Sequence, residues 1–90
     1  MEYKKTVKIT NKLGFHMRAA AVFAIEAEKF KSVIKVRRGE IEADGKSIMG
    51  LMTLIAPQDS EVELKAEGND AKEALEKLSK LIKNKFGEKE

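Results

Sequence analysis

The order in which two kinds of apolar periodicity follow one another limits the folds open to this chain. Four segments alternate polar and apolar side chains, which predicts half-buried strands at residues 5–10, 32–37, 40–43 and 61–66. Two segments repeat apolar side chains every three or four positions, which predicts helices at residues 17–30 and 70–86, and Ser47 as a possible N-cap predicts a short helix at residues 48–54. The predicted order is βαββαβα, with residues 56–60 as a loop.

Each predicted element has one apolar face. The inward positions expected in the first three strands are Val7, Ile9, Ile34, Val36, Ile41 and Ala43, with a hairpin break at Arg38-Gly39. Those of the long helices are Ala20, Phe23, Ala27 and Phe30, then Ala71, Ala74, Leu75, Leu78, Leu81, Ile82 and Phe86. Asp70 and Glu73 have the spacing of a capping box. One helix layer on a sheet with a wet outer face predicts an open-faced α/β sandwich, although a ferredoxin-like split βαβ with an extra helix fits the same order.

Composition fits one domain over residues 1–90 and argues against several classes of protein. The chain has no cysteine and one histidine, so we expect no disulfide, no metal site and no cofactor. The longest apolar run, residues 19–25, is too short to span a bilayer, and we expect a cytoplasmic protein. The net charge of +3 favours acidic or phosphorylated partners but is too small to indicate nucleic-acid binding.

The segment Gly14-Phe15-His16-Met17-Arg18 places the only histidine where a turn gives way to an apolar helix. The first N–H groups of a helix lack intrahelical acceptors, and the helix dipole adds partial positive charge, so a phosphoryl group is stabilised there. Arg18 adds a permanent charge. Imidazole can be both nucleophile and leaving group near neutral pH, which predicts transient phosphate on a solvent-exposed His16. The alternative is a histidine that only caps the helix or occupies the loop.

Two other patterns do not support catalysis. Residues 39–47 look like a nucleotide-binding loop, but five residues separate Gly39 from Gly45-Lys46-Ser47 where that motif has four, and they alternate as a strand does. The carboxylates lie on expected solvent faces, where nothing would raise a pKa. We therefore do not expect an enzyme in its own right.

The helix expected at residues 48–54 carries more apolar side chains than so short a helix can bury. Ser47 is the expected N-cap, since its hydroxyl can accept a hydrogen bond from a free N–H of the first turn. Met49 and Met52 either form a surface ridge that docks partner proteins or fill gaps in the core. Val22 and Ile25 of the first helix lie off its inward stripe and raise the same question.

Two segments together resemble the HPr family, the histidine-containing phosphocarriers of the bacterial phosphoenolpyruvate-dependent sugar phosphotransferase system. They are Gly14-Phe15-His16-Met17-Arg18-Ala19-Ala20 and Lys46-Ser47-Ile48-Met49-Gly50-Leu51-Met52. The resemblance covers essentially the whole chain, including the βαββαβα order and the turn Ala66-Glu67-Gly68. It implies an α+β open-faced β-sandwich in which a four-stranded antiparallel sheet, of order 1-4-2-3, carries three helices on one face.

The resemblance also implies roles and partners. His16 matches the histidine that is phosphorylated at Nδ1, and Arg18 matches the arginine beside it. Ser47 matches the serine that HPr kinase/phosphorylase modifies in many bacteria to control carbon use, in concert with a catabolite-control regulator. Enzyme I is the implied donor, sugar-specific acceptor proteins are the recipients, and a monomer suits such a shuttle. The side chains expected to dock these partners are Met17, Ala21, Ile48, Met49 and Met52.

Two positions depart from the family pattern: Met17 stands where a small residue is usual, and Ala19 where proline is usual. Alanine adopts the same helical geometry at a cost of under about 1 kcal/mol, so the departures concern the aim of His16 and the fit of partners. A regulatory paralogue that acts in carbon or nitrogen control by protein binding is therefore an alternative. A small basic RNA-binding α/β domain is another, although its sheet would need exposed aromatic side chains.

Overall fold

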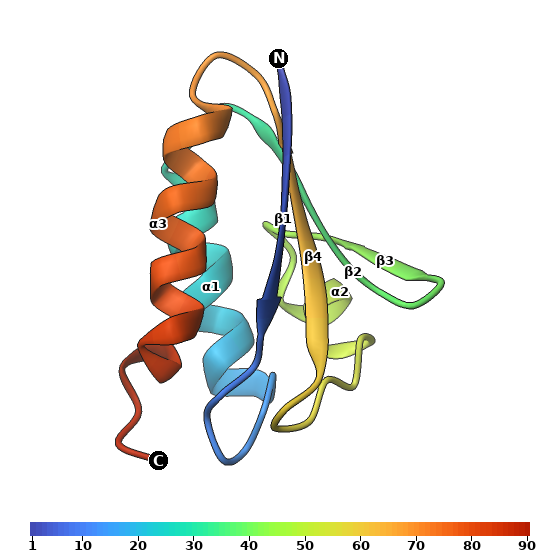
Figure 1. Cartoon of the computed structure of the whole chain (residues 1–90), viewed down its shortest axis with the longest axis vertical. Helices are drawn as coiled ribbons and strands as arrows, with labels where there is room; N and C mark the ends of the chain where they lie inside the picture. Colours follow the sequence, from blue (N-terminus) through green and yellow to red (C-terminus); the bar gives the residue numbers. More distant parts are fainter.

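The structure, a computed structural model, describes all 90 residues and has the predicted order of strands and helices (Figure 1). The strands form one antiparallel sheet in the order β1-β4-β2-β3. This is the strand order that the resemblance implies. The bounds are β1 Glu2–Lys8, α1 Met17–Glu28, β2 Val33–Arg38, β3 Ile41–Asp44, α2 Ile48–Met52, β4 Glu61–Glu67, α3 Ala71–Lys83 and the 3₁₀ turn η1 Lys85–Gly87.

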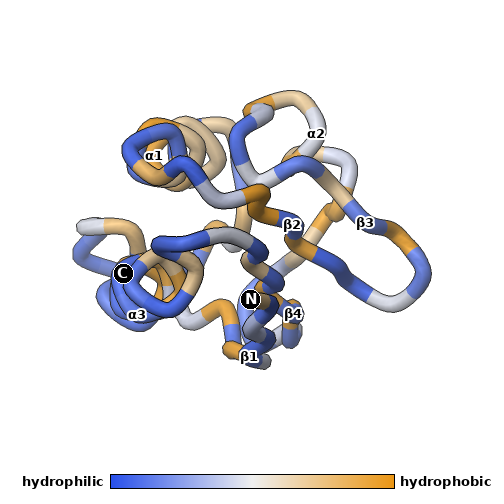
Figure 2. The backbone as a smooth tube through the Cα atoms, turned by 90° about the horizontal axis from the view of Figure 1, so that it is seen from above, coloured by the Kyte–Doolittle hydropathy of each residue, from blue (hydrophilic) through white to orange (hydrophobic).

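The three helices cover one face of the sheet and leave the other open. Figure 2 shows α1 and α3 side by side on the same side of the sheet, with α2 next to the β2–β3 hairpin. A single cluster of 24 buried hydrophobic side chains fills the space between the layers. None of the helices is long and apolar enough to cross a membrane. The open-faced sandwich is therefore confirmed, and the split βαβ alternative is not adopted.

Two predictions about individual residues are wrong. Ile41 was expected to point into the core, but it pairs with Arg38 at the tip of the hairpin, away from α1 and α3, and is 46% exposed. Asp70 does not form a capping box with Glu73. Its carboxylate accepts hydrogen bonds from the backbone N–H groups of Lys31 and Ser32, at 2.8 and 3.0 Å, and from the Ser32 hydroxyl. A contact distant in sequence replaces the local cap.

The last helix is shorter than predicted. Its apolar stripe extends to Phe86, but α3 ends at Lys83, and Lys85 and Phe86 adopt left-handed backbone angles with φ of 58° and 55°. The turn lets Phe86 stay buried, with its ring centroid 5.1 Å from that of Phe15. The C-terminal residues therefore lie at the end of the molecule where β1 leads into α1 (Figure 1).

Candidate functional site

The loop before α1 fixes the backbone that leads to His16. Gly14 has φ of +70°, and a Cβ there would lie 2.4 Å from the carbonyl oxygen of Ala56, so only glycine fits. The N–H of Phe15 donates to that carbonyl at 2.8 Å, and the Phe15 ring is buried, with its centroid 5.5 Å from that of Phe23. His16 follows immediately as the N-cap residue of α1. The fold thus places the imidazole at the positive end of a 12-residue helix.

The backbone N–H groups of the first helical turn are free. Ala20 donates to the carbonyl of His16 at 2.8 Å, whereas Met17, Arg18 and Ala19 have no backbone acceptor and His16 makes no side-chain cap. The Arg18 side chain is exposed and forms no ion pair. Free amides and an uncommitted guanidinium at one helix end are suited to hold an anion. Ala19 is buried in this turn, so the helix starts at Met17 without the usual proline.

The imidazole of His16 is less open than the sequence prediction of a solvent-exposed ring. Its side chain is 26% exposed, and Nε2 lies 2.5 Å from Oε2 of Glu88 in the C-terminal tail. The other ring nitrogen, Nδ1, has no hydrogen-bond partner in the protein. One edge of the ring is therefore occupied by a carboxylate, while the nitrogen on the other edge is free to react.

Glu88 is held in place by the loop that carries the histidine. Asn11 Nδ2 donates to Glu88 Oε1 at 2.9 Å and to the carbonyl oxygen of Gly14 at 2.7 Å. Burial by itself would raise the pKa of Glu88. The hydrogen bonds from Asn11 and His16, together with the charges of His16 and Arg18, outweigh burial, so the pKa lies below its ordinary value. Glu88 is therefore an ionised carboxylate near neutral pH.

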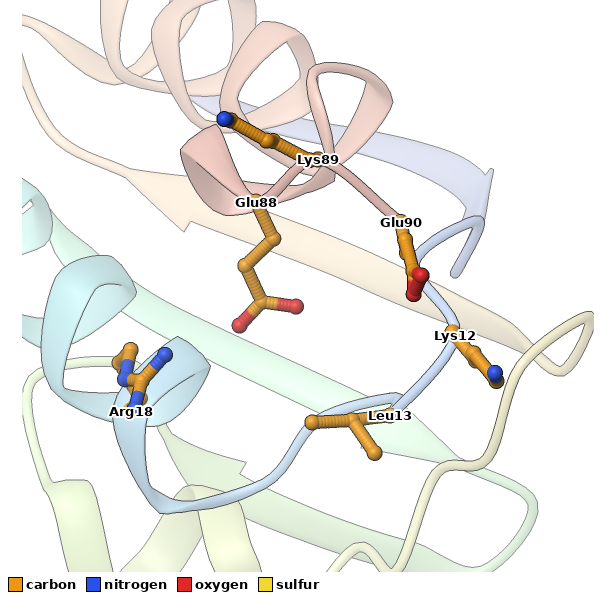
Figure 3. A pocket seen from close by; sticks show the side chains of 6 residues that line it. All are labelled: Lys12, Leu13, Arg18, Glu88, Lys89 and Glu90. Carbon is orange, nitrogen blue, oxygen red and sulfur yellow. The ribbon is translucent and has the colours of Figure 1, made fainter.

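A hollow of about 360 Å³ opens beside this pair. Figure 3 shows the Glu88 carboxylate pointing into it, with Arg18 of α1 on one side and Lys12 and Glu90 on the other. Its six lining residues combine three cations with two carboxylates and one apolar side chain: Lys12, Leu13, Arg18, Glu88, Lys89 and Glu90. His16 itself does not line this hollow, which opens next to the carboxylate that contacts its Nε2.

Nothing in the sequence analysis pointed to Glu88 or Asn11. The tail Gly87-Glu88-Lys89-Glu90 has the composition of a solvated chain end, and Asn11 belongs to an ordinary turn segment. Seventy-two residues separate Glu88 from His16 along the chain. Only the left-handed turn at Lys85 and Phe86 brings them together, and this turn was not predicted.

Ser47 is the N-cap of α2, as predicted. Its Oγ accepts a hydrogen bond from the N–H of Gly50 at 3.0 Å, and the Ser47 side chain is partly exposed. The ammonium group of the preceding residue, Lys46, donates to the carbonyl of Phe30 at 2.7 Å. This hydrogen bond connects the segment before α2 to the segment after α1. Ser47 thus lies at the free end of a short helix, on the same side of the sheet as His16.

The methionine face is an exposed apolar surface between His16 and α2. It comprises Leu13, Met17, Ile48, Met49, Met52 and Ile55, which are between 38% and 80% exposed. Met49 and Met52 are therefore exposed and do not fill core gaps, while the docking of partners on them stays a prediction. A hollow of about 370 Å³, lined mainly by apolar residues and by His16, opens on this face.

Three more residues of α1 that the sequence singled out differ in how far they are exposed. Ala21 is half-buried on α1, Val22 packs partly against the core, and Ile25 is 63% exposed.

All four phenylalanines are buried, so the open sheet face offers no phenylalanine platform for stacking RNA bases. The 90 residues contain no group of three or more His, Cys, Asp or Glu side chains placed to bind a metal ion.

Comparison with known proteins identifies relatives over almost the full length. The family model described as "PTS HPr component phosphorylation site" matches residues 3–84. The chain is 44% identical to the phosphocarrier protein HPr of Neisseria meningitidis over 87 residues, which are 97% of this chain and 98% of that protein. A phosphocarrier protein named NPr, from Shewanella violacea, is 38% identical, with 94% and 93% covered.

Solved structures of HPr and of Crh also superpose on this chain. HPr-C-His from Thermoanaerobacter tengcongensis superposes with a TM-score of 0.93 at 44% identity, covering 98% of this chain and 99% of that one. Crh, the catabolite repression HPr of Bacillus subtilis, superposes in one crystal structure with a TM-score of 0.75 at 39% identity, covering 88% and 91%.

Proposed function

The chain belongs to the HPr family of the phosphotransferase system, and we propose that it accepts a phosphoryl group on Nδ1 of His16 and passes it on. The donor is phosphorylated enzyme I, and the recipients are sugar-specific acceptor proteins. The observation that carries the proposal is the unpartnered Nδ1 of a partly exposed ring at the free N-terminus of α1, beside an uncommitted Arg18. In this proposal residues 1–90 act as one cytoplasmic domain.

The proposed transfer is a displacement at phosphorus. The lone pair of His16 Nδ1 attacks the phosphoryl group of the donor phosphohistidine, and the donor P–N bond breaks with its electron pair returning to the donor nitrogen. The amides of the first α1 turn and Arg18 stabilise the phosphoryl oxygens. An acceptor histidine or cysteine later attacks the same phosphorus and releases His16. The ring is partly exposed, so the partner can leave after each transfer and the exchange stays reversible.

Partner proteins dock, in this proposal, on the methionine face through Met17, Ile48, Met49 and Met52, and on Ala21, which lies one helical turn after Met17 on α1. Flexible methionines suit a surface that must accept several partners in turn. Ser47 borders this face, so a phosphate added there by a kinase would place negative charge next to the docking surface. An acidic partner would then be repelled while the fold is kept, because a helix N-terminus tolerates the charge.

The test is phosphorus NMR of the purified chain after incubation with phosphoenolpyruvate and enzyme I. We expect an acid-labile, base-stable phosphate signal that His16→Ala abolishes and Ser47→Ala leaves intact. Unchanged incorporation in His16→Ala contradicts the proposal.

A regulatory paralogue is the second candidate, because the relatives include proteins named NPr and Crh. It predicts that Ser47→Ala changes binding of a regulatory partner, whereas His16→Ala has little effect in the cell. Measuring partner binding and sugar uptake for both variants separates the two candidates.

A further inference from the structure

The contact between His16 and the C-terminal tail has a geometry that constrains the proton on the imidazole. Nε2 lies 2.5 Å from Glu88 Oε2, a close contact between a ring nitrogen and a carboxylate oxygen that requires a shared hydrogen. An ionised carboxylate can only accept, so the proton must be on Nε2. In the neutral ring, this leaves Nδ1 without a proton and with its lone pair available.

We propose that Glu88 is a positioning residue for phosphoryl transfer: by accepting a hydrogen bond from Nε2–H of His16, it presents Nδ1 as the nucleophile. This inference rests on the proposed function, because it concerns how His16 is prepared for the transfer. It adds a residue from the far end of the chain to the machinery of the site.

The carboxylate is itself oriented by the loop around His16. Asn11 is fully buried, and its Nδ2 holds Glu88 Oε1 at 2.9 Å, so each carboxylate oxygen has one donor. A second link joins the same two segments, because the N–H of Lys12 donates to a main-chain oxygen of Glu90 at 2.6 Å. Glu88 is 15% exposed and His16 26%, so water screens the pair less than a surface ion pair. The ring orientation is therefore determined by several groups together.

Glu88 also matches the charge that the transfer creates. When the Nδ1 lone pair forms the new bond to phosphorus, the donor P–N bond breaks and its electron pair stays on the donor nitrogen. No proton leaves His16 in this step. The imidazole then carries the phosphoryl group on Nδ1 and the proton on Nε2, so the ring becomes cationic opposite the Glu88 carboxylate. Transfer to an acceptor reverses these changes, with the proton still on Nε2.

The direction in which the pKa of Glu88 is shifted agrees with this arrangement. Its pKa lies below the ordinary value, although burial opposes the shift, because Asn11 and His16 donate to it. Glu88 therefore keeps its charge over the neutral range in which the transfer takes place.

The experiment compares Glu88→Gln with Glu90→Gln in the full chain. Both changes remove one negative charge from the same hollow, but Glu90 makes no side-chain contact with His16. Two quantities are measured: the ¹⁵N shifts of the His16 ring nitrogens, at a pH where the ring is neutral, and the initial rate of phosphorylation by phosphorylated enzyme I. The backbone amide spectrum shows whether each variant is folded.

We expect Glu88→Gln to bring the Nδ1 and Nε2 shifts closer together, since a neutral amide holds the proton on Nε2 less firmly. The phosphorylation rate should fall on the order of tenfold, the effect of losing one hydrogen bond to a charged group. Glu90→Gln should change neither quantity. Glu88→Asp, which keeps the charge on a shorter side chain, should recover part of the rate.

Three outcomes overturn the inference: ring shifts that do not move, a rate equal to that of Glu90→Gln, or a faster transfer, which would make Glu88 an obstruction. Failure of the proposed function gives a different result. In that case the unmodified chain takes no phosphate on His16, whatever residue 88 is.

Discussion

Two carboxylates at opposite ends of the molecule use the same hydrogen-bond chemistry for different purposes. Asp70 lies where β4 leads into α3, and Glu88 lies near the start of α1 (Figure 1). Both accept hydrogen bonds from residues more than thirty positions away, and the pKa of each lies below its ordinary value. Their partners differ, however.

The partners of Asp70 are the Ser32 hydroxyl and the N–H groups of Lys31 and Ser32, in the turn between α1 and β2. The main partners of Glu88 are the buried side-chain amide of Asn11 and the partly exposed imidazole of His16. A carboxylate that holds backbone groups contributes to folding, whereas one that accepts from a ring nitrogen also fixes which nitrogen of the neutral ring carries the proton. We infer that loss of Asp70 reduces stability and that loss of Glu88 reduces transfer.

The largest expected effect on stability is that of replacing Gly14, in the loop that leads to His16. Gly14→Ala should lower the free energy of unfolding by about 3 kcal/mol, from a left-handed backbone and overlap with Ala56. Gly39→Ala is the matched control, since Gly39 has φ of +61° but no atom within 4 Å, and it should cost about 1 kcal/mol. Urea unfolding measures both. Equal costs would show that the Ala56 contact does not matter.

Removal of the other carboxylate should have a smaller effect on stability and none on chemistry. Asp70→Ala frees two N–H groups and a hydroxyl, so the melting temperature should fall, by less than for Gly14→Ala, while the phosphorylation rate stays unchanged. Glu73→Ala, in the same helical turn, should have little effect because no capping box exists. A slower phosphorylation of folded Asp70→Ala would contradict the inference that Asp70 affects only stability.

The smallest effect is the pH dependence of the Glu88 contribution. Because its pKa is lower in the folded state, the unfolded state binds more protons, and this contribution to stability is complete above the ordinary value of 4.5. It is lost as the pH falls through the folded pKa. The stability difference between the unmodified chain and Glu88→Gln should therefore shrink in acid, whereas Glu90→Gln serves as the reference. A difference that grows in acid contradicts the sign of the shift.

Local signals in the sequence were sufficient for most of the fold. Period-two spacing predicted the four strands and helical spacing the two long helices, because each amphipathic element must bury one face. Ser47 was predicted as an N-cap because its hydroxyl reaches an N–H only three residues away. His16 and Arg18 were identified as a candidate site from neighbouring positions. Such features depend on residues close together in the chain.

The errors and omissions involve contacts distant in sequence. Asp70 binds residues near position 32 in place of its own helix, and Ile41 is exposed because the hairpin extends beyond the helices. Glu88 reaches His16 through the turn at Phe86, whose burial against Phe15 outweighs the continuation of α3. Periodicity contains no information on such contacts. The sequence therefore indicated His16 as a candidate site but gave no sign of the carboxylate that contacts its ring.

The most direct test of the account is phosphorus–nitrogen coupling in the phosphorylated chain with ¹⁵N-labelled histidine. A single histidine is present, so the assignment of the phosphate to one ring nitrogen is unambiguous. We predict a one-bond coupling from phosphorus to Nδ1 of His16, with the proton on Nε2. Coupling to Nε2, or a phosphate signal without any coupling to histidine nitrogen, would contradict the account.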